Sequence, residues 1–188
     1  MGAGRTPSQT IGPFFHDALL DRDRSELVSP DHPSAIRIVG AVYDGAGEVV
    51  LDAMVEIWQA DPTGRYDDPE AGDSPQPEDA FTGFGRSGTV SGEFSFVTLK
   101  PGPVPDPDGR LQAPHVMVTV FARGLLKPLV TRVYFPDEGE ANAADPVLSS
   151  IEEPELRNTL IARDEGGALR FDVRLQGEDQ TAFFEFAG

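Results

Sequence analysis

The stretch Pro101-Gly-Pro-Val-Pro-Asp-Pro-Asp-Gly-Arg-Leu-Gln-Ala-Pro-His-Val-Met-Val118 is a proline-rich loop that runs into an alternating segment. Its first four prolines each fix φ and lack a backbone donor, so the loop is stiff and cannot join a sheet interior. The segment from His115 predicts a strand, in which side chains two residues apart point to the same face. His115 and Met117 therefore share a face, where a His-x-His pair would present two metal ligands side by side.

Outward from this loop, short alternating segments separated by turn residues fill most of the chain. Alternation of apolar and polar residues is typical of strands with one buried face. We predict strands over residues 35–43, 49–59, 93–99, 115–122, 129–135, 169–176 and 181–186. In the second of these, alternation places Leu51, Val55 and Ile57 on the inner face. Many short strands with turns between them predict an all-β sandwich.

Helix is expected to be a minor component, confined to residues 140–162. Asp145 stands directly before Pro146. This is the pattern of an N-cap residue followed by proline at the first helical position, where its missing N–H costs nothing. We therefore predict that a short helix begins here.

The chain is expected to divide into an N-terminal arm over residues 1–34 and a sandwich domain over residues 35–188. Phe14 and Phe15 are adjacent in the arm and call for burial, against the chain's own core or against another subunit. Residues 67–79 hold six acidic residues and three prolines with no basic residue. That composition cannot bury itself, so it predicts an exposed, mobile loop.

The overall composition limits the classes of function. At 188 residues, with 39% apolar and 25% charged residues, the chain suits one domain with a sizeable core. The formal net charge of −17 excludes nucleic acid and anionic membrane surfaces as partners, because both attract clustered Lys and Arg. The chain contains no cysteine, which excludes disulfides, zinc thiolate sites and iron–sulfur clusters. No apolar run has the length of a signal peptide or a membrane span, so we expect a cytoplasmic protein.

Few polar residues are candidates for chemistry. His16, His32 and His115 are the only histidines, and a lone histidine at the start of a strand is more often a structural hydrogen-bonding group than a ligand. Tyr66 follows a turn, where it is either a partly buried aromatic or a phenolate ligand for a hard ion such as ferric iron. Arg123 is either a solvated residue at a strand end or a carboxylate-binding group, which strand parity places on the His115 side if the strand runs that far. The residues alone leave these alternatives open.

Six blocks of sequence carry a resemblance to a known family. They occur in order and extend over nearly the whole chain: Thr6-Pro-Ser-Gln-Thr-Ile-Gly-Pro-Phe14, Glu56-Ile-Trp-Gln-Ala-Asp-Pro-Thr-Gly-Arg-Tyr66, Lys100-Pro-Gly-Pro103, Ala113-Pro-His115, Phe121-Ala-Arg-Gly124 and Arg170-Phe-Asp-Val-Arg-Leu-Gln-Gly-Glu178. Together they resemble the intradiol ring-cleaving dioxygenases. The resemblance implies the β-sandwich of that family and a non-heme Fe(III) centre held by two tyrosines and two histidines.

The resemblance also implies that this chain has lost its own iron site. Tyr66 and His115 match one ligand of each kind, while Val104 stands in place of the second tyrosine and Met117 in place of the second histidine. Valine cannot coordinate a metal, and a thioether is a poor ligand for a hard ferric ion. Gln112 stands where the family has a catalytic arginine. We therefore expect no metal in this chain and only degenerate ligand positions.

This pattern resembles the iron-free α subunit of a heteromeric family member, whose β subunit binds the Fe(III). The resemblance implies that the α subunit helps to form the substrate pocket of the β subunit, supplies no catalytic residue and is inactive alone. The residues implied to line that pocket are Thr10, Gly12, Pro13, Phe14 and Arg123. Phe14 departs from the tyrosine that is common at its position.

The implied reaction is cleavage of a carboxylated catechol by O₂ between its two hydroxylated carbons, giving 3-carboxy-cis,cis-muconate in the β-ketoadipate pathway of aromatic catabolism. Two other hypotheses remain. One is a stand-alone β-sandwich binding protein without catalysis. The other is an independent iron enzyme in which Tyr134 or His16 replaces a lost ligand.

Overall fold

The computed structural model describes residues 10, 12, 18–20, 24–67 and 81–185. The predicted acidic loop, apart from its first residue, lies outside these residues, as do Pro13, Phe14 and His16. No helix within the described residues is both long enough and apolar enough to cross a bilayer.

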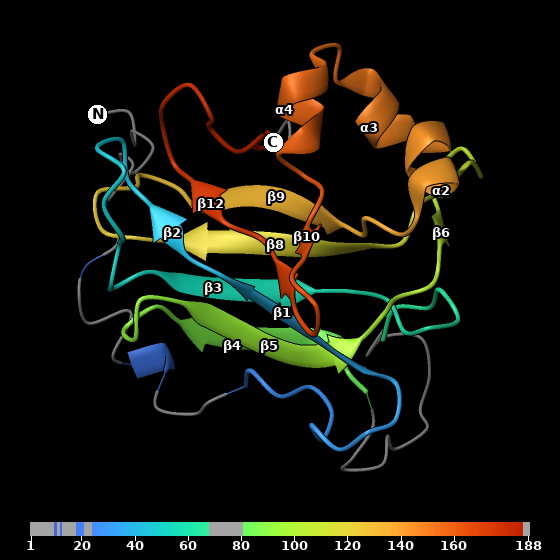
Figure 1. Cartoon of the computed structure of the whole chain (residues 1–188), viewed down its shortest axis with the longest axis horizontal. Helices are drawn as coiled ribbons and strands as arrows, with labels where there is room; N and C mark the ends of the chain where they lie inside the picture. The colour runs from blue at the N-terminus through green and yellow to red at the C-terminus, as the bar shows by residue number, and fades with distance from the viewer. Residues whose placement is uncertain (1–9, 11, 13–17, 21–23, 68–80, 186–188) are drawn as a thin grey trace, which may run out of the picture.

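Two four-stranded sheets form the body of the domain (Figure 1). The first is antiparallel, in the order β4 (Phe84–Gly88), β3 (Met54–Trp58), β8 (His115–Phe121) and β9 (Leu129–Tyr134). The second is mixed, in the order β10 (Arg163–Asp164), β11 (Leu169–Arg170), β1 (Ala35–Gly40) and β5 (Phe94–Leu99). Strand β1 is antiparallel to β5 and parallel to β11.

Smaller elements surround the two sheets. Two short ladders pair β2 (Val42–Tyr43) with β12 (Val173–Arg174), and β6 (Val104–Pro105) with β7 (Leu111–Gln112). Three helices follow β9: α2 (Gly139–Ala144), α3 (Pro146–Ser150) and α4 (Pro154–Asn158). Figure 1 shows these helices grouped together on the β9 side of the molecule. The predicted helical region is therefore confirmed, as three short helices.

The core lies where the inner faces of the strands meet. Its buried apolar side chains include Ile38, Val55, Ile57, Phe94, Phe96, Val116, Val118, Val120 and Val133. In β8 the even-numbered valines are buried in this core, so the odd-numbered side chains point to the opposite face of the sheet. His115 and Met117 therefore share a face, as the alternation predicts, and the structure shows that it is the outer one.

Several predicted strands are shorter in the structure. The segment 49–59 forms a strand only over β3, because a turn precedes it, and Leu51 in that turn is 55% exposed. The prediction that Leu51 faces inward is wrong. The hydroxyl of Thr89 stabilises this turn by donating to the Val50 carbonyl, at 2.6 Å, and by accepting from the Ala53 N–H, at 3.0 Å.

The C-terminal region also forms less strand than predicted. The segment 169–176 is divided into β11 and β12, and a carboxylate oxygen of Asp172 between them accepts a hydrogen bond from the Ala41 N–H. Within 181–185, a single antiparallel bridge joins Phe184 to Val130. These short pairings show why alternation alone overestimates strand length: side chains compete for backbone hydrogen bonds that a longer ladder would use.

Candidate functional site

The turn that precedes Tyr66 packs against the proline loop that precedes Val104, so these two ligand positions lie near each other. The carboxylate of Asp61 closes this turn by accepting backbone hydrogen bonds from inside it. Gly64 has φ of +79°, and a Cβ there would lie 2.2 Å from the Pro103 carbonyl oxygen. The turn before Tyr66 is therefore packed directly against the proline loop that leads into β6, and only glycine fits at this contact.

Strand register aligns the other positions, in the small β6–β7 ladder and on the outer face of the first sheet. The pairs are Val104 with Gln112 across β6 and β7, and His115 with Tyr134 and Met117 with Arg132 across β8 and β9. Directly opposed residues in antiparallel strands place their side chains within contact distance. The structure thus brings together the four degenerate ligand positions, Tyr66, Val104, His115 and Met117, which we call the degenerate centre. It adds Arg132 and Tyr134 from β9.

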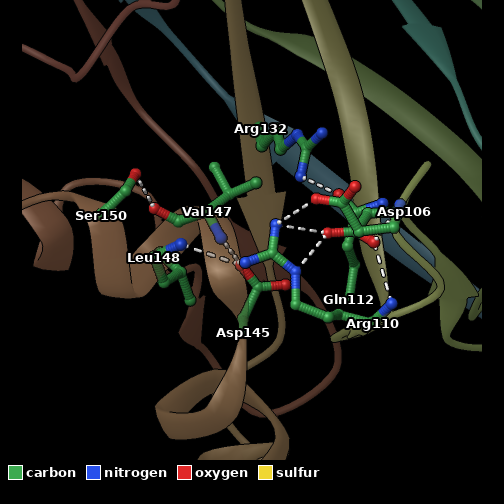
Figure 2. Close-up of polar contacts among 9 residues, drawn as sticks. Asp106, Arg110, Gln112, Arg132, Asp145, Val147, Leu148 and Ser150 are labelled. Atoms are coloured by element: carbon green, nitrogen blue, oxygen red, sulfur yellow. Dashed lines mark hydrogen bonds and ion pairs between the residues drawn. The ribbon is translucent and has the colours of Figure 1, made fainter.

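The guanidinium of Arg132 lies among these side chains. Its Nε donates to the sulfur of Met117 at 3.2 Å, and its Nη1 donates to Gln112 Oε1 at 2.7 Å and to the Tyr134 hydroxyl at 3.2 Å. Figure 2 shows the guanidinium of Arg132 directed at Gln112. The positive charge of Arg132 also acts on His115 and Tyr66: it adds to the lowering of the His115 pKa by burial, and it partly offsets the rise of the Tyr66 pKa by burial. Arg132 is thus a neighbour of the whole degenerate centre.

His115 keeps the arrangement of a metal ligand. The residue is 3% exposed, and burial, followed by the charge of Arg132, lowers the pKa of its imidazole to about 4. The ring is therefore neutral near pH 7. Its Nδ1 lies 2.8 Å from the Ala113 carbonyl oxygen, which can only accept, so Nδ1 carries the proton and Nε2 keeps the lone pair. Histidine ligands in proteins are commonly oriented in this way by a backbone carbonyl.

Tyr66 is a neutral phenol in this structure. The residue is 38% exposed, and its ring stacks on Trp58 with centroids 6.2 Å apart and an interplanar angle of 4°. Partial burial raises the pKa of Tyr66, and the charge of Arg132 offsets that rise only in part. Tyr66 thus has the position of a ligand, and without a metal it is a neutral phenol.

Asp145 supports the centre from behind and is fully buried. Its carboxylate caps α3 by accepting from the Val147 and Leu148 N–H groups, both at 2.8 Å (Figure 2). The same carboxylate accepts from the Ala113 N–H at 2.8 Å and from the Tyr134 hydroxyl at 3.2 Å. The helix cap predicted from sequence is confirmed. The structure adds a second role for Asp145, which accepts hydrogen bonds from Ala113 and Tyr134 beside the degenerate centre.

The hypothesis of an independent iron enzyme needs Tyr134 or His16 as a replacement ligand. The hydroxyl of Tyr134 is engaged by Arg132 and by Asp145, and burial raises its pKa far above the usual range. Tyr134 is therefore held as a neutral hydrogen-bonding group. His16 lies outside the described residues.

The residues at the centre do not fit a ferric ion. Val104 is a buried hydrocarbon, and Met117 offers a soft thioether that already accepts a hydrogen bond from a cation. Among the described residues, no cluster of three or more His, Cys, Asp or Glu side chains has the arrangement of a metal site. A permanent positive charge stands beside the two ligand types that remain.

Arg123 lies at a different end of the molecule from this centre. Strand β8 ends at Phe121, so Arg123 falls in the turn beyond it, roughly 20 Å along the strand from His115. Strand parity would place Arg123 on the His115 side only if the strand reached it, and that condition is not met because β8 ends two residues earlier. The Arg123 side chain is 69% exposed and forms an ion pair with Asp52.

Thr10 is the residue of the arm that the structure joins to this turn. Its hydroxyl accepts a hydrogen bond from the Gly124 N–H at 3.1 Å. Gly12 is exposed, and a Cβ there would have nothing within 4 Å. Two residues predicted to bind substrate, Thr10 and Arg123, are thus adjacent in space although 113 positions apart in sequence. Pro13 and Phe14 lie outside the described residues.

Comparison with known proteins identifies the family. The dioxygenase family model matches residues 11–177. The protocatechuate 3,4-dioxygenase alpha chain of Pseudomonas putida is 44% identical over 198 residues, which cover 96% of each chain. This chain belongs to the intradiol dioxygenase family. The alpha chain of the same enzyme from Burkholderia cepacia is 43% identical to this family member, covering 96% and 97% of the two chains, and the beta chain from that organism is 33% identical, covering 93% and 77%.

Solved structures agree with this membership. The dioxygenase domain of a carbohydrate-binding fusion protein from Streptomyces sp. SirexAA-E is 25% identical, covers 85% of this chain and 89% of its own, and superposes with a TM-score of 0.55. Catechol 1,2-dioxygenase from Acinetobacter radioresistens covers 86% of this chain and 60% of its own with a TM-score of 0.56, and at 18% identity it shows the fold alone. The predicted all-β intradiol-dioxygenase sandwich is confirmed. Enzymes of this family use non-heme iron.

Proposed function

We propose that this chain is the iron-free α subunit of a protocatechuate 3,4-dioxygenase, and that a β subunit binds the Fe(III). The observation that carries the proposal is the degenerate centre: Val104 and Met117 replace two ligands, and the guanidinium of Arg132 lies beside the rest. The higher identity to two alpha chains, 44% and 43%, than to a beta chain, 33%, supports the same assignment.

In the proposed assembly the β subunit cleaves protocatechuate with O₂ to 3-carboxy-cis,cis-muconate. Both oxygen atoms enter the product, and the iron of the β subunit orients and activates the catechol. This chain contributes the shape of the pocket and the exclusion of water around the substrate. The cytoplasmic location expected from the sequence belongs to the same proposal.

Arg123 is proposed to bind the carboxylate of the substrate. The guanidinium of Arg123 is exposed and is paired with the carboxylate of Asp52. A substrate carboxylate can therefore replace Asp52 as the partner of Arg123, and neither Arg123 nor Asp52 is left buried without a partner. A local cation is needed because the chain as a whole has a net charge of −17 and repels anions. Arg123 is therefore proposed to act on substrate binding rather than on the chemical step.

The N-terminal arm is proposed to complete the same pocket. Thr10 anchors the arm beside Arg123 through the Gly124 N–H. Gly12, Pro13 and Phe14 follow Thr10 directly in sequence, so they are proposed to line the pocket of the β subunit. The later part of the arm is occupied elsewhere, because residues 24–27 pair with the chain's own strands β4 and β5.

Expression with and without a β subunit tests the proposal. The chain purified alone should lack stoichiometric iron and should not consume O₂ with protocatechuate. The co-purified complex should bind about one iron for each pair of chains and cleave the ring. Turnover by this chain alone would contradict the proposal and favour an independent iron enzyme, whereas failure to associate with any β subunit would favour a stand-alone binding protein.

A further inference from the structure

We propose that the guanidinium of Arg132 occupies the place of the metal in this chain, so that a built-in cation, and not only the loss of two ligands, keeps iron out. The inference concerns the chain's own centre. It stands or fails separately from the proposed α-subunit role, because it is tested on the chain without a partner and without measuring ring cleavage.

The position of Arg132 follows from strand register. Arg132 is the direct cross-strand neighbour of Met117, which stands where the second histidine ligand would be. Its Nε lies 3.2 Å from the Met117 sulfur, so the cation is already in contact with a ligand position. Nη1 extends to Gln112, the cross-strand neighbour of Val104, at 2.7 Å. The guanidinium thus bridges from one lost ligand position toward the other.

Arg132 donates hydrogen bonds to acceptors on three different strands, and a metal ion likewise binds ligands from separate elements. A planar guanidinium presents its N–H donors in fixed directions. Here those donors are directed at a sulfur, an amide oxygen and a hydroxyl oxygen, supplied by β8, β7 and β9 respectively. A metal ion organises a site in the same sense, by gathering electron-pair donors from separate elements. Loss of the ion would otherwise leave these polar atoms facing one another without a common partner.

A counter-charge allows the cation to remain at a partly buried position. The Tyr134 hydroxyl accepts from Arg132 Nη1 and donates to the buried carboxylate of Asp145 at 3.2 Å. The ring of Phe184 adds a cation–π contact, with the Arg132 Cζ 5.8 Å from its centroid.

The consequence is electrostatic exclusion. The family's centre holds iron beside the catalytic arginine that Gln112 replaces, so the position of the charge decides the outcome. The guanidinium of Arg132 is in hydrogen-bond contact with the ligand position 117, and a ferric ion there would meet a like charge at close range. Restoring the missing ligands alone, by Val104→Tyr and Met117→His, should therefore not restore a ferric site. Removing the charge of Arg132 as well should restore one.

The decisive comparison uses the full chain and ferric citrate as the source of iron. Three variants are prepared: V104Y/M117H, V104Y/M117H/R132Q and V104Y/M117H/R163Q. Arg163 is the matched control, since it is 67% exposed, is paired with Asp172, and gives the same change in net charge away from the centre. Iron is measured by metal analysis after gel filtration and by the visible charge-transfer band that a tyrosinate–Fe(III) bond produces.

We expect the R132Q triple variant to bind ferric iron at least tenfold more tightly than the double variant, with the coloured band, and the R163Q triple variant to match the double variant. Equal iron binding by the double and R132Q variants would overturn the proposal.

If the R132Q variant does not fold, R132K and R132M in the same double background make the same test. Lysine keeps the charge and should keep iron out, whereas methionine removes the charge and should admit iron; equal binding by these two would likewise refute it.

Discussion

Met117 and Arg132 face each other across β8 and β9, and the sulfur of Met117 accepts a hydrogen bond from Arg132 Nε at 3.2 Å. A neutral histidine at position 117 would present a nitrogen in place of this sulfur. Methionine instead supplies a soft, weak acceptor that suits a guanidinium better than a ferric ion. The substitution at 117 and the arginine at 132 are therefore two parts of one change in the chemistry of the centre.

Replacing Arg123 with alanine should weaken the use of a carboxylated substrate by the assembled enzyme. Loss of a charge-assisted hydrogen bond costs about 1.5–3 kcal/mol, so we expect KM for protocatechuate to rise roughly tenfold or more while kcat changes little. Steady-state O₂ consumption by the α/β complex measures both constants. Catechol, which lacks the carboxylate, should show a much smaller change.

Arg163→Ala is the matched control for that experiment, because Arg163 is equally exposed and also paired with an aspartate. It should leave KM for protocatechuate as in the wild type. If Arg123→Ala behaves like this control, Arg123 does not contact the substrate.

Replacing Asp145 with alanine should destabilise the chain by about 3 kcal/mol or more. The change removes a helix cap and leaves a buried hydrogen-bond network without its acceptor, and the loss of buried polar partners typically costs this much. Urea unfolding followed by circular dichroism measures the difference in free energy. Asp108→Ala, which removes an exposed ion pair with Arg110, should change stability by no more than about 1 kcal/mol. Equal losses for the two variants would refute the role given to Asp145.

Stability should rise with pH between about 4 and 6.5 through His115. The pKa of His115 is lowered to about 4 in the folded chain, whereas the unfolded chain has the ordinary value near 6.5, so the unfolded chain binds more protons in this window. Lowering the pH from 6.5 to 4 therefore removes about 3 kcal/mol of stability that depends on the neutral ring.

Urea unfolding of wild type and His115→Asn across this range tests the point. Other groups titrate in both proteins, so the measured quantity is the difference between the two stability curves. We expect that difference to shrink as the pH falls toward 4. Parallel curves would show that His115 is not held neutral by its surroundings.

Replacing Gly64 with alanine should cost about 2–4 kcal/mol, because it combines a positive φ with a close approach to backbone. The new Cβ would lie 2.2 Å from the Pro103 carbonyl oxygen, so the turn that holds Tyr66 must separate from the proline loop. Gly109→Ala isolates the first effect, since Gly109 has φ of +82° with nothing within 4 Å of an added Cβ, and it should cost only about 1 kcal/mol. Unfolding midpoints in urea compare the two, and equal costs would mean that the contact with Pro103 is not tight.

What the sequence determined by itself is the set of side chains and their local pattern. Alternation predicts β5, β8 and β9 and the shared face of His115 and Met117, because a period of two is a property of any strand. The Asp145–Pro146 pair predicts the start of α3, because a helix cap needs only neighbouring residues. Together with the family resemblance, the identities at 104 and 117 predict that two ligands of the family's iron centre are missing.

What only the tertiary structure decided is which residues from distant segments meet. The sequence around Arg132 indicates only that it belongs to an alternating strand. Its position beside the degenerate centre depends on the register of β9 against β8. The exposure of Leu51 and the position of Arg123 depend on where β3 begins and where β8 ends, and competing side-chain and turn hydrogen bonds set those limits. Local sequence specifies direction and periodicity, whereas register and strand ends come from packing and from long-range hydrogen bonds between segments.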